Sequence, residues 1–264
     1  MKIGLIGFGN MASAITGGML KNGLAKPEDI SVSRRDEEKL IEIESKYQIA
    51  ATTDNREVAK EADVLILAVK PQMLSGVIEE IRGITRPEQL IVSIAAGKSI
   101  KWLCEAFGRT VKIVRCMPNT PALVGEACTG ICFNRLVSQE EKTYILDLFS
   151  CLGMASEVPE NLMDVVVGVS GSSPAYVFMF IEAIADAAVC MGMPRKQAYE
   201  FTAQAVMGSA KLMLETGKHP GELKDMVCSP AGTTIEAVRV LEDKGMRSAV
   251  IEAMMKCLDI SRNM

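Results

Sequence analysis

Two glycines and an alanine near the start of the chain have the spacing with which protein backbones hold dinucleotides. Gly7, Gly9 and Ala12 lie in the sequence MKIGLIGFGNMASA, after a β-branched run and before an amphipathic helical pattern. In such a turn the first glycine permits a tight bend, the second lets the backbone approach a pyrophosphate, and the alanine allows close helix packing. The N-terminus of the helix then faces the phosphates. A turn that is merely rich in glycine is the alternative, but the expected strand before it and helix after it favour a dinucleotide.

The residues that end the second expected strand indicate which dinucleotide is preferred. Domains specific for NAD usually place an acid there for the ribose 2′-hydroxyl, whereas this chain has Ser33, Arg34 and Arg35. Two guanidinium groups suit a 2′-phosphate, so the sequence favours NADPH, with NADH as an alternative donor. Asp36 could still reach a ribose, and a solvated helix start in which Arg35 and Asp36 pair on the surface is the structural alternative.

The chain offers few groups that could move a proton. Its only histidine, His219, lies in a His-Pro-Gly turn, for which we expect a structural role. One family of hydroxyacid dehydrogenases opens its second domain with G-x-x-G-x-G-x-x-x-K-x-x-x-N, but Val177 and Ile181 occupy the lysine and asparagine positions here. A cyclic iminium ion already carries its proton and accepts hydride at carbon without a general base. The missing base therefore favours the reduction of an imine.

A polar turn late in the chain, within VCSPAGTTIEAV, is a second candidate binding site. Residues 229–234 lie just before a helical pattern over about 235–241, so their backbone amides would lie at a helix N-terminus. Such amides can bind a carboxylate without a lysine or arginine. An ordinary Ser/Thr helix cap is the alternative.

Two different sequence patterns divide the chain. Up to about residue 158, short β-branched runs alternate with helical patterns, which is typical of βαβ units and a mostly parallel sheet. The expected strands are 3–7, 30–33, 64–68, 90–94 and 111–117. After residues 159–161 the β signal stops, and apolar residues recur at helical spacing. We therefore expect an α/β protein with an N-terminal Rossmann-like, mostly parallel sheet domain over residues 1–160, followed by an all-helical domain over residues 161–264.

Composition and charge exclude several classes of protein. Apolar residues make up 48% and charged residues 23% of the 264-residue chain, as in a folded soluble protein. A net charge of −4, without runs of like charge, leaves no footprint for nucleic acid. The eight cysteines include no C-x-x-C pair, and Cys128 and Cys132 have no histidine nearby, so we expect reduced thiols, no metal and a cytoplasmic location. The longest apolar stretch, 174–191, carries two acids, which suits a helix buried in protein rather than lipid.

Six short motifs, in this order along the chain, resemble the pyrroline-5-carboxylate reductase family, whose members catalyse the last step of proline biosynthesis. They are GFGNMA from residue 7, AVKP from 68, AAG from 95, RCMPNTP from 115, SGSSPAY from 170 and VCSPAGTTIEAV from 227. The resemblance implies an oxidoreductase that reduces 1-pyrroline-5-carboxylate to L-proline by hydride transfer from NAD(P)H. It also implies that the helical domain is a dimerisation domain, so that the protein is a homodimer or a higher homo-oligomer with no nucleic-acid or membrane partner.

The resemblance assigns the late polar turn to the substrate. It implies that the amides of Gly232, Thr233 and Thr234 hold the pyrroline carboxylate, that Ser229 belongs to the same site, and that the Thr234 hydroxyl bonds the ring nitrogen as the catalytic group. Members of the family often have glycine where this chain has Ala231, so the methyl group raises a question about the geometry of the turn.

The resemblance also implies which residues contact the cofactor. They are Ile6, Gly7, Phe8, Gly9, Asn10 and Met11 at the pyrophosphate; Ser33, Arg34, Arg35 and Asn55 at the adenosine; and Ala68, Val69, Lys70, Pro71, Ile94, Ala95 and Ala96 at the nicotinamide. For Lys70 we expect cofactor positioning rather than catalysis. Asn119 is expected either to orient the nicotinamide or to cap a turn.

Two other functions stay open from the sequence. One is a different NADPH-dependent imine reductase with the same architecture. The other is a non-catalytic module that senses dinucleotides.

Overall fold

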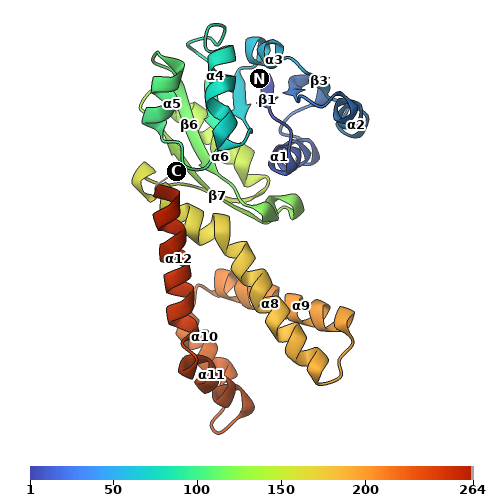
Figure 1. The fold of residues 1–264 in the computed structure, drawn as a ribbon, viewed down its shortest axis with the longest axis vertical. Coiled ribbons are helices and arrows are strands. Elements are labelled where there is room, and N and C mark those ends of the chain that lie inside the picture. Colours follow the sequence, from blue (N-terminus) through green and yellow to red (C-terminus); the bar gives the residue numbers. More distant parts are fainter. Residues whose placement is uncertain (263–264) are drawn as a thin grey trace. The chain divides into compact units, whose positions relative to one another are not determined.

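The computed structural model describes residues 1–262 and divides them into two compact units (Figure 1). Unit 1 comprises Met1–Ser172 together with the segment that begins at Cys257, and unit 2 comprises Ser173–Lys256. Unit 2 is therefore inserted into the chain of unit 1. The sequence predicts a domain boundary between residues 160 and 161, just after the last strand, whereas the two packed units meet at residues 172/173 and 256/257. The boundary at 160/161 stays a prediction.

Unit 1 is built on one sheet of eight strands in the order β3-β2-β1-β4-β5-β6-β7-β8. Neighbouring strands are parallel except β6 and β7, which are antiparallel. Because β1 lies between β2 and β4, the strand order reverses beside β1, and ligands of such sheets bind at this point, at the carboxyl ends of the strands. The strands are β1 (Ile3–Ile6), β2 (Ile30–Ser33), β3 (Ala50–Thr52), β4 (Val64–Leu67), β5 (Leu90–Ser93), β6 (Lys112–Met117), β7 (Ala127–Phe133) and β8 (Gly153–Glu157).

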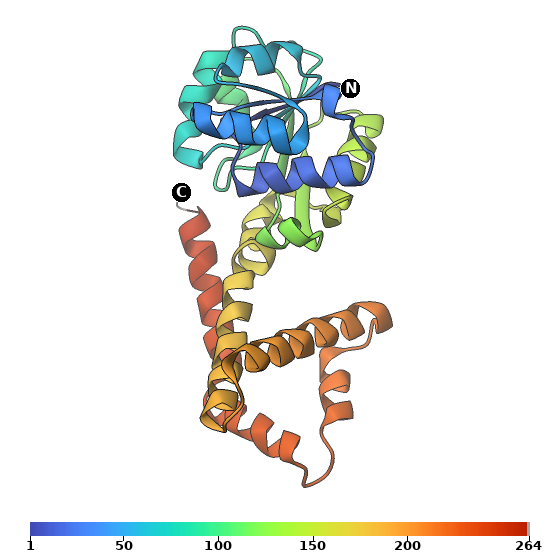
Figure 2. The same cartoon turned by 90° about the vertical axis from the view of Figure 1, so that its right-hand side faces the viewer.

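Two apolar layers cover the faces of the sheet. One contains side chains of α1, α2 and α6, with Met19 and Phe149 fully buried, and the other contains side chains of α3, α4 and α5, with Ile78 and Leu103 fully buried. Figure 2 shows α1 and α2 in blue, on the face of the sheet turned toward the viewer. The helices of unit 1 are α1 (Asn10–Lys21), α2 (Glu37–Tyr47), α3 (Asn55–Glu61), α4 (Leu74–Ile81), α5 (Ile100–Phe107), α6 (Gln139–Ser150) and α7 (Met163–Val166), the last continued by a π-helical segment, Val167–Ser172.

The five expected strands are all present, and the mostly parallel Rossmann-like sheet is confirmed. Three further strands, β3, β7 and β8, were not expected. β3 has only three residues and β8 contains no β-branched residue, so neither gives a strand signal of its own. β7 has the sequence ACTGICF, in which a central glycine interrupts the β signal.

A buried ionic cluster holds together three segments of unit 1 that lie far apart in sequence. Arg115 on β6 is 6% exposed, and its guanidinium lies 3.6 Å from Glu160 Oε1 and 3.6 Å from Asp164 Oδ1. Ser261 Oγ donates to Asp164 Oδ1 at 3.1 Å, and the amide of Ile100 donates to Glu160 Oε1 at 2.6 Å. The cluster therefore fixes to the sheet both the segment that leads into unit 2 and the segment that returns from it.

Unit 2 is entirely helical. Its helices are α8 (Ser173–Cys190), α9 (Arg195–Thr216), α10 (Pro220–Val227), α11 (Thr233–Asp243) and the larger part of α12 (Met246–Arg262). α8 packs against α9, where Ala185 and Ala198 are buried, and α10 and α11 connect α9 to α12 (Figure 2). Large apolar side chains remain exposed along these helices, including Phe178, Met179, Phe201 and Ile251.

The helical segment Glu160–Cys190 is, by length and composition alone, apolar enough to cross a membrane, the one such helix among residues 1–262. Its most apolar stretch has a mean hydropathy of 1.4 and is almost unburied within the single chain. A helix that is covered by a second protein chain has the same composition, so these values alone do not distinguish lipid from a protein partner.

Candidate active site

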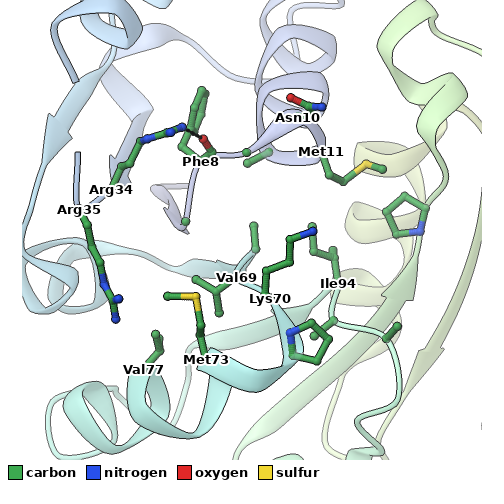
Figure 3. Close-up of a pocket in the computed structure, with 18 of the residues that line it drawn as sticks. Phe8, Asn10, Met11, Arg34, Arg35, Val69, Lys70, Met73, Val77 and Ile94 are labelled. Carbon is green, nitrogen blue, oxygen red and sulfur yellow. Dashed lines mark hydrogen bonds between the residues drawn. The ribbon is translucent and has the colours of Figure 1, made fainter. Parts of the chain in front are cut away.

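A cavity of about 740 Å³ opens at the carboxyl ends of β1, β2, β4 and β5 (Figure 3). Each of these strands is followed by lining residues, since the chain turns there toward the next helix. The lining residues are Gly7, Phe8, Gly9, Asn10, Met11, Ala12, Arg34, Arg35, Asp36, Asn55, Ala68, Val69, Lys70, Pro71, Met73, Val77, Ile94, Ala95, Ala96, Pro118, Thr120 and Leu123. All of them belong to unit 1.

The turn between β1 and α1 has the geometry that its glycines require. Gly7 has φ +86°, and a Cβ there would lie 2.7 Å from Val69 Cγ1 and 2.9 Å from the Ala68 carbonyl oxygen. Gly9 is the N-cap of α1 without a capping side chain, and a Cβ there would meet no protein atom within 4 Å. Ala12 is buried where α1 approaches the sheet. Folding therefore requires glycine at position 7, whereas position 9 leaves open space beside unpaired amides, which fits the pyrophosphate of a dinucleotide.

The two arginines after β2 lie differently. Arg34 Nη1 donates to the carbonyl oxygen of Phe8 at 2.5 Å, and Arg34 Nη2 lies 3.8 Å from Asp36 Oδ2. Arg35 is exposed and has no ion pair or hydrogen bond within residues 1–262. Figure 3 shows the two guanidinium groups pointing apart, that of Arg34 toward Phe8 and that of Arg35 toward the side of Met73 and Val77.

A short chain of side-chain hydrogen bonds supports the side of the cavity at which Asn55 lies. Ser33 Oγ donates to Asn55 Oδ1 at 2.7 Å, and Asn55 Nδ2 donates to Glu80 Oε2 at 2.8 Å. Ser33 is fully buried and does not line the cavity, whereas Asn55 does. Ser33 therefore orients Asn55 and has no direct access to a ligand.

Residues 68–71 and 94–96, which we expect at the nicotinamide, also line the cavity. Lys70 lies just past β4, before a short 3₁₀ turn that begins at Pro71, and its side chain extends into the cavity (Figure 3). No acid in residues 1–262 pairs with its ammonium group.

Asn119 does not line the cavity, although its neighbours Pro118 and Thr120 do. Its side-chain amide donates to the carbonyl oxygen of Ser170 at 2.9 Å and accepts from the amide of Cys128 at 2.9 Å. The geometry favours the second of the two expected roles, that of fixing the backbone, over contact with the nicotinamide. Ile6 is likewise buried in the sheet and contributes no surface to the cavity.

The sequence interpretation missed several lining residues. Met73 and Val77 lie one helical turn apart after Pro71, so that both face the cavity, and this spacing was a usable signal. Pro118 and Thr120 flank Asn119 in the motif RCMPNTP, from which only Asn119 was assigned to the site. Leu123 gave no signal, because its exposure depends on how the 3₁₀ segment Thr120–Val124 folds.

The late polar turn lies in unit 2, at the start of α11. Gly232 is the N-cap without a capping side chain, and the amide of Gly232 donates to the carbonyl oxygen of Ser229 at 3.0 Å. The amide of Gly232, expected to hold a carboxylate, is thus used within the turn. Thr233 and Thr234 occupy the first turn of α11, where amides have no acceptor in the helix, and neither hydroxyl has a partner within residues 1–262.

The turn before α11 accommodates alanine at position 231, where similar sequences often have glycine. Ala231 has φ +55°, in the left-handed region that favours glycine. A Cβ on Gly232 would lie 2.3 Å from Ser229 Oγ, so the turn also needs its one remaining glycine. The turn keeps its shape with a methyl group at position 231, at a cost in backbone strain.

The remaining candidates for proton transfer or metal binding have structural surroundings. His219 is the N-cap of α10, and its Nδ1 accepts from the amide of Gly221 at 3.1 Å, which confirms the structural role expected for it. Burial raises the pKa of the Cys132 thiol to about 12 and that of Cys151 to about 11, so neither thiol ionises near neutral pH. Within residues 1–262, no group of three or more His, Cys, Asp or Glu side chains could hold a metal ion.

Comparisons with known proteins cover both units. A family model described as pyrroline-5-carboxylate reductase dimerisation matches residues 160–264, and one described as NADP oxidoreductase, coenzyme F420-dependent, matches residues 2–97. The chain is 54% identical to the pyrroline-5-carboxylate reductase of Escherichia coli (strain K12) over 263 residues, which covers 100% of this chain and 98% of the relative. It is 46% identical to that of Methanosarcina acetivorans, over 100% of this chain and 97% of the relative.

Two solved structures resemble the whole chain. The pyrroline-5-carboxylate reductase of Coxiella burnetii matches with a TM-score of 0.92 and 35% identity, over 99% of this chain and 97% of that chain. The pyrroline carboxylate reductase of Plasmodium falciparum with NADP bound matches with a TM-score of 0.91 and 31% identity, over 100% of this chain and 97% of that chain.

Proposed function

The chain belongs to the pyrroline-5-carboxylate reductase family, and we propose which of its residues carry out the reaction of that family. The protein is an oxidoreductase that reduces 1-pyrroline-5-carboxylate to L-proline by hydride transfer from NAD(P)H, the last step of proline biosynthesis. The residue roles below, the preference for NADPH, the oligomer and the location are the proposal.

The cavity in unit 1 binds the dinucleotide, which supplies the hydride. The single observation that carries this assignment is the open space at Gly9, within the cavity and beside the N-terminus of α1, which has no capping side chain. Backbone amides in such a place bind phosphate groups. The adenosine lies toward Asn55 and the arginines, where Met73 and Val77 offer an apolar surface for a flat base. The nicotinamide lies toward residues 68–71 and 94–96. Unpaired positive charge at Arg35 supports a preference for the 2′-phosphate of NADPH over NADH.

The turn before α11 binds the substrate. The amides of Thr233 and Thr234 hold the carboxylate, since they have no helical acceptor and the dipole of an 11-residue helix favours an anion there. Ser229 and Gly232 shape this turn through their own hydrogen bond, and the unpaired hydroxyl of Ser229 faces the same turn. The Thr234 hydroxyl bonds the ring nitrogen and so keeps the imine oriented while hydride reaches its carbon.

No protein group needs to donate a proton at carbon in this reaction. The iminium nitrogen carries its proton before hydride arrives, so the part of the protein is to position substrate and cofactor. The residues that line the cavity include no histidine, and burial raises the pKa of the Cys132 thiol to about 12, so this thiol stays protonated near neutral pH. Lys70, without an acid partner, holds the cofactor in place and adds positive charge to the cavity, which favours an anionic substrate.

The protein acts as a homodimer or a higher homo-oligomer in the cytoplasm. The dimerisation model that covers residues 160–264 and the exposed apolar side chains of unit 2 support the oligomer. The occurrence of similar reductases in bacteria and archaea supports the location.

The test follows NADPH absorbance with 1-pyrroline-5-carboxylate and identifies proline as the product. Turnover of cyclic imines that lack the carboxylate, at similar rates, would favour a different imine reductase. Tight NADPH binding without oxidation by any imine would favour a dinucleotide-sensing module.

The Thr234→Ala variant tests the catalytic role. We expect kcat/KM for the imine to fall about ten- to hundred-fold, the worth of one hydrogen bond to a charged group, with little change in NADPH affinity. Thr233→Ala is the matched control, because its backbone amide remains. Normal kinetics with a lowered melting temperature in Thr234→Ala would instead identify a simple helix cap, worth about 1 kcal/mol.

A further inference from the structure

The two arginines that follow β2 are adjacent in sequence but not equivalent in structure. We propose that Arg34 is a positioning residue that fixes the pyrophosphate-binding turn for either dinucleotide, while Arg35 supplies the charge that distinguishes NADPH from NADH. This division of roles rests on the proposed function of the cavity and goes beyond it, because the sequence assigns both arginines to the 2′-phosphate.

The hydrogen bond from Arg34 to Phe8 acts on the peptide that joins Phe8 to Gly9. Arg34 Nη1 donates to the carbonyl oxygen of Phe8 at 2.5 Å. Because a trans peptide is planar, its C=O and N–H bonds point in opposite directions. Holding the carbonyl of Phe8 toward Arg34 therefore directs the amide of Gly9 away from Arg34. An amide fixed in this way binds a pyrophosphate with less loss of conformational entropy than a mobile one.

The side chain of Phe8 is held from a second direction. Phe8 is 6% exposed, and its ring meets the ring of Tyr47 edge-on, with the centroids 5.7 Å apart. The Tyr47 hydroxyl lies 2.5 Å from Ser13 Oγ on α1, so the end of α2 and the first turns of α1 enclose Phe8 together. Arg34 completes this enclosure at the carbonyl. The turn thus depends on residues of the β2–α2 segment that touch no phosphate.

Arg34 is less suited than Arg35 to bind a 2′-phosphate. Asp36 lies 3.8 Å from Arg34 Nη2 and partly neutralises its charge, and Nη1 is already used at Phe8. Moving Arg34 to a phosphate would leave the Phe8 carbonyl without this partner. Arg35 is exposed, lines the same cavity and keeps all its donors unused within residues 1–262, as a bidentate phosphate contact requires.

The test measures the dissociation constants of NADPH and NADH, without substrate, for the full chain and a matched pair of variants. Arg34→Met and Arg35→Met both remove the guanidinium and keep an apolar stem. In Arg35→Met we expect the Kd of NADPH to rise about ten-fold or more and that of NADH to stay within about two-fold. In Arg34→Met we expect both constants to rise by a similar factor of about five to ten, so that their ratio is unchanged.

Three outcomes would overturn the inference. The first is a selective loss of NADPH affinity in Arg34→Met. The second is unchanged affinity for both dinucleotides together with an unchanged melting temperature in that variant. The third is unchanged affinity with a lowered melting temperature, which would identify a purely structural residue. If Arg34→Met does not fold, Arg34→Lys replaces it, and a changed ratio of the two constants then counts against the proposal.

Failure of the proposed function is a separate result. It would appear as a wild-type protein that binds both dinucleotides but forms no proline from 1-pyrroline-5-carboxylate. A changed ratio in the Arg34 variants, with normal proline formation by the wild type, would refute only the division of roles.

Discussion

Unit 1 and unit 2 place their apolar side chains in opposite ways. In unit 1, strands such as β1, β4 and β5 are buried along their whole length between two layers of helices. Between Ser173 and Lys256 the only buried apolar residues are Ala185 and Ala198, while Phe178, Met179 and Met191 are more than half exposed. The first unit is stabilised by its own core, whereas the second is completed only by covering its surface.

The difference shows that the cavity and the exposed apolar faces belong to different parts of the chain, the cavity to unit 1 and most of the exposed faces to unit 2. A sheet packed on both faces is rigid, and it fixes the strand ends at which the cofactor residues lie. Helices that leave their apolar surface exposed are unstable as isolated elements and gain stability from a second copy. We therefore expect changes on the exposed apolar faces of unit 2 to act on assembly, and changes in unit 1 to act on the cavity or on local stability.

The largest effect is expected from a charge on the exposed face of α8. Met179 is 68% exposed in the single chain, so Met179→Glu costs the monomer little but buries an unpaired carboxylate in a dimer. We expect the dimer dissociation constant to rise at least a hundred-fold and proline formation to fall with it. Analytical ultracentrifugation over a range of concentrations measures the first effect.

Ile41→Glu is the matched control, because Ile41 on α2 is 71% exposed but belongs to unit 1. We expect its sedimentation and activity to be those of the wild type. A dimer that tolerates Met179→Glu would show that the surface of α8 is not covered in the assembly.

Next in size is the effect of a side chain at Gly9. A Cβ there meets nothing within 4 Å beyond its chain neighbours, so Gly9→Val should fold, with a melting temperature lowered only slightly because valine is a poorer N-cap than glycine. The valine occupies the space assigned to the pyrophosphate, so we expect NADPH binding to weaken at least a hundred-fold, or by more than about 2.7 kcal/mol.

Gly7→Ala provides the contrast to Gly9→Val. Its Cβ would meet Val69 and Ala68, at a φ of +86°, so we expect it to lower the melting temperature as well. Normal NADPH affinity in Gly9→Val would contradict the assignment of this turn to the cofactor.

A smaller effect is expected from the ionic cluster of unit 1. Arg115→Met leaves Glu160 and Asp164 without their common partner, and both carboxylates are about one-third exposed, which reduces the penalty. We expect a loss of about 2 kcal/mol in the free energy of unfolding, measured by urea denaturation at fixed protein concentration.

Lys101→Ala is the control for Arg115→Met, because it removes an exposed i,i+4 pair with Glu105. Its expected cost is less than about 0.5 kcal/mol. Equal losses in the two variants would mean that burial adds nothing to the cluster.

The smallest effect is expected in the turn before α11. Ala231 holds a left-handed φ of +55°, and glycine adopts this conformation without strain. Ala231→Gly should stabilise the protein by about 0.5 to 1 kcal/mol, the relief of strain less the added freedom of the unfolded chain. A destabilised Ala231→Gly variant would indicate that the methyl group packs favourably in the assembled protein.

Much of the cavity could be predicted from the sequence because its residues follow strand ends. The runs over 3–6, 64–67 and 90–93 are almost continuously apolar, which marks buried parallel strands, and the residues after them, which we expect to contact the cofactor, line the cavity. Three of the expected contacts, Ile6, Ser33 and Asn119, lie behind the surface instead, since a motif gives the order of residues but not the direction of each side chain.

Long-range contacts could not be predicted. The bond from Arg34 to the Phe8 carbonyl and the cluster around Arg115 join segments separated by many residues, and nothing in the local sequence distinguishes them from surface charges. The strained Ala231 was detectable only as a departure from the glycine that is frequent in similar sequences. β8 was missed because its pairing with β7, and not its own composition, makes it a strand.

The insertion of unit 2 into unit 1 also determines the order in which the protein can be completed during synthesis. Leu258 and Ser261, which pack on unit 1, emerge from the ribosome only after all of unit 2 has been made. Until then Asp164 lacks the hydroxyl of Ser261, and Ser172 lacks the thiol of Cys257, which lies 3.2 Å from its hydroxyl in the finished protein. The sheet can therefore form early on the nascent chain, whereas the docking of the last turn of α12 waits until unit 2 has been made.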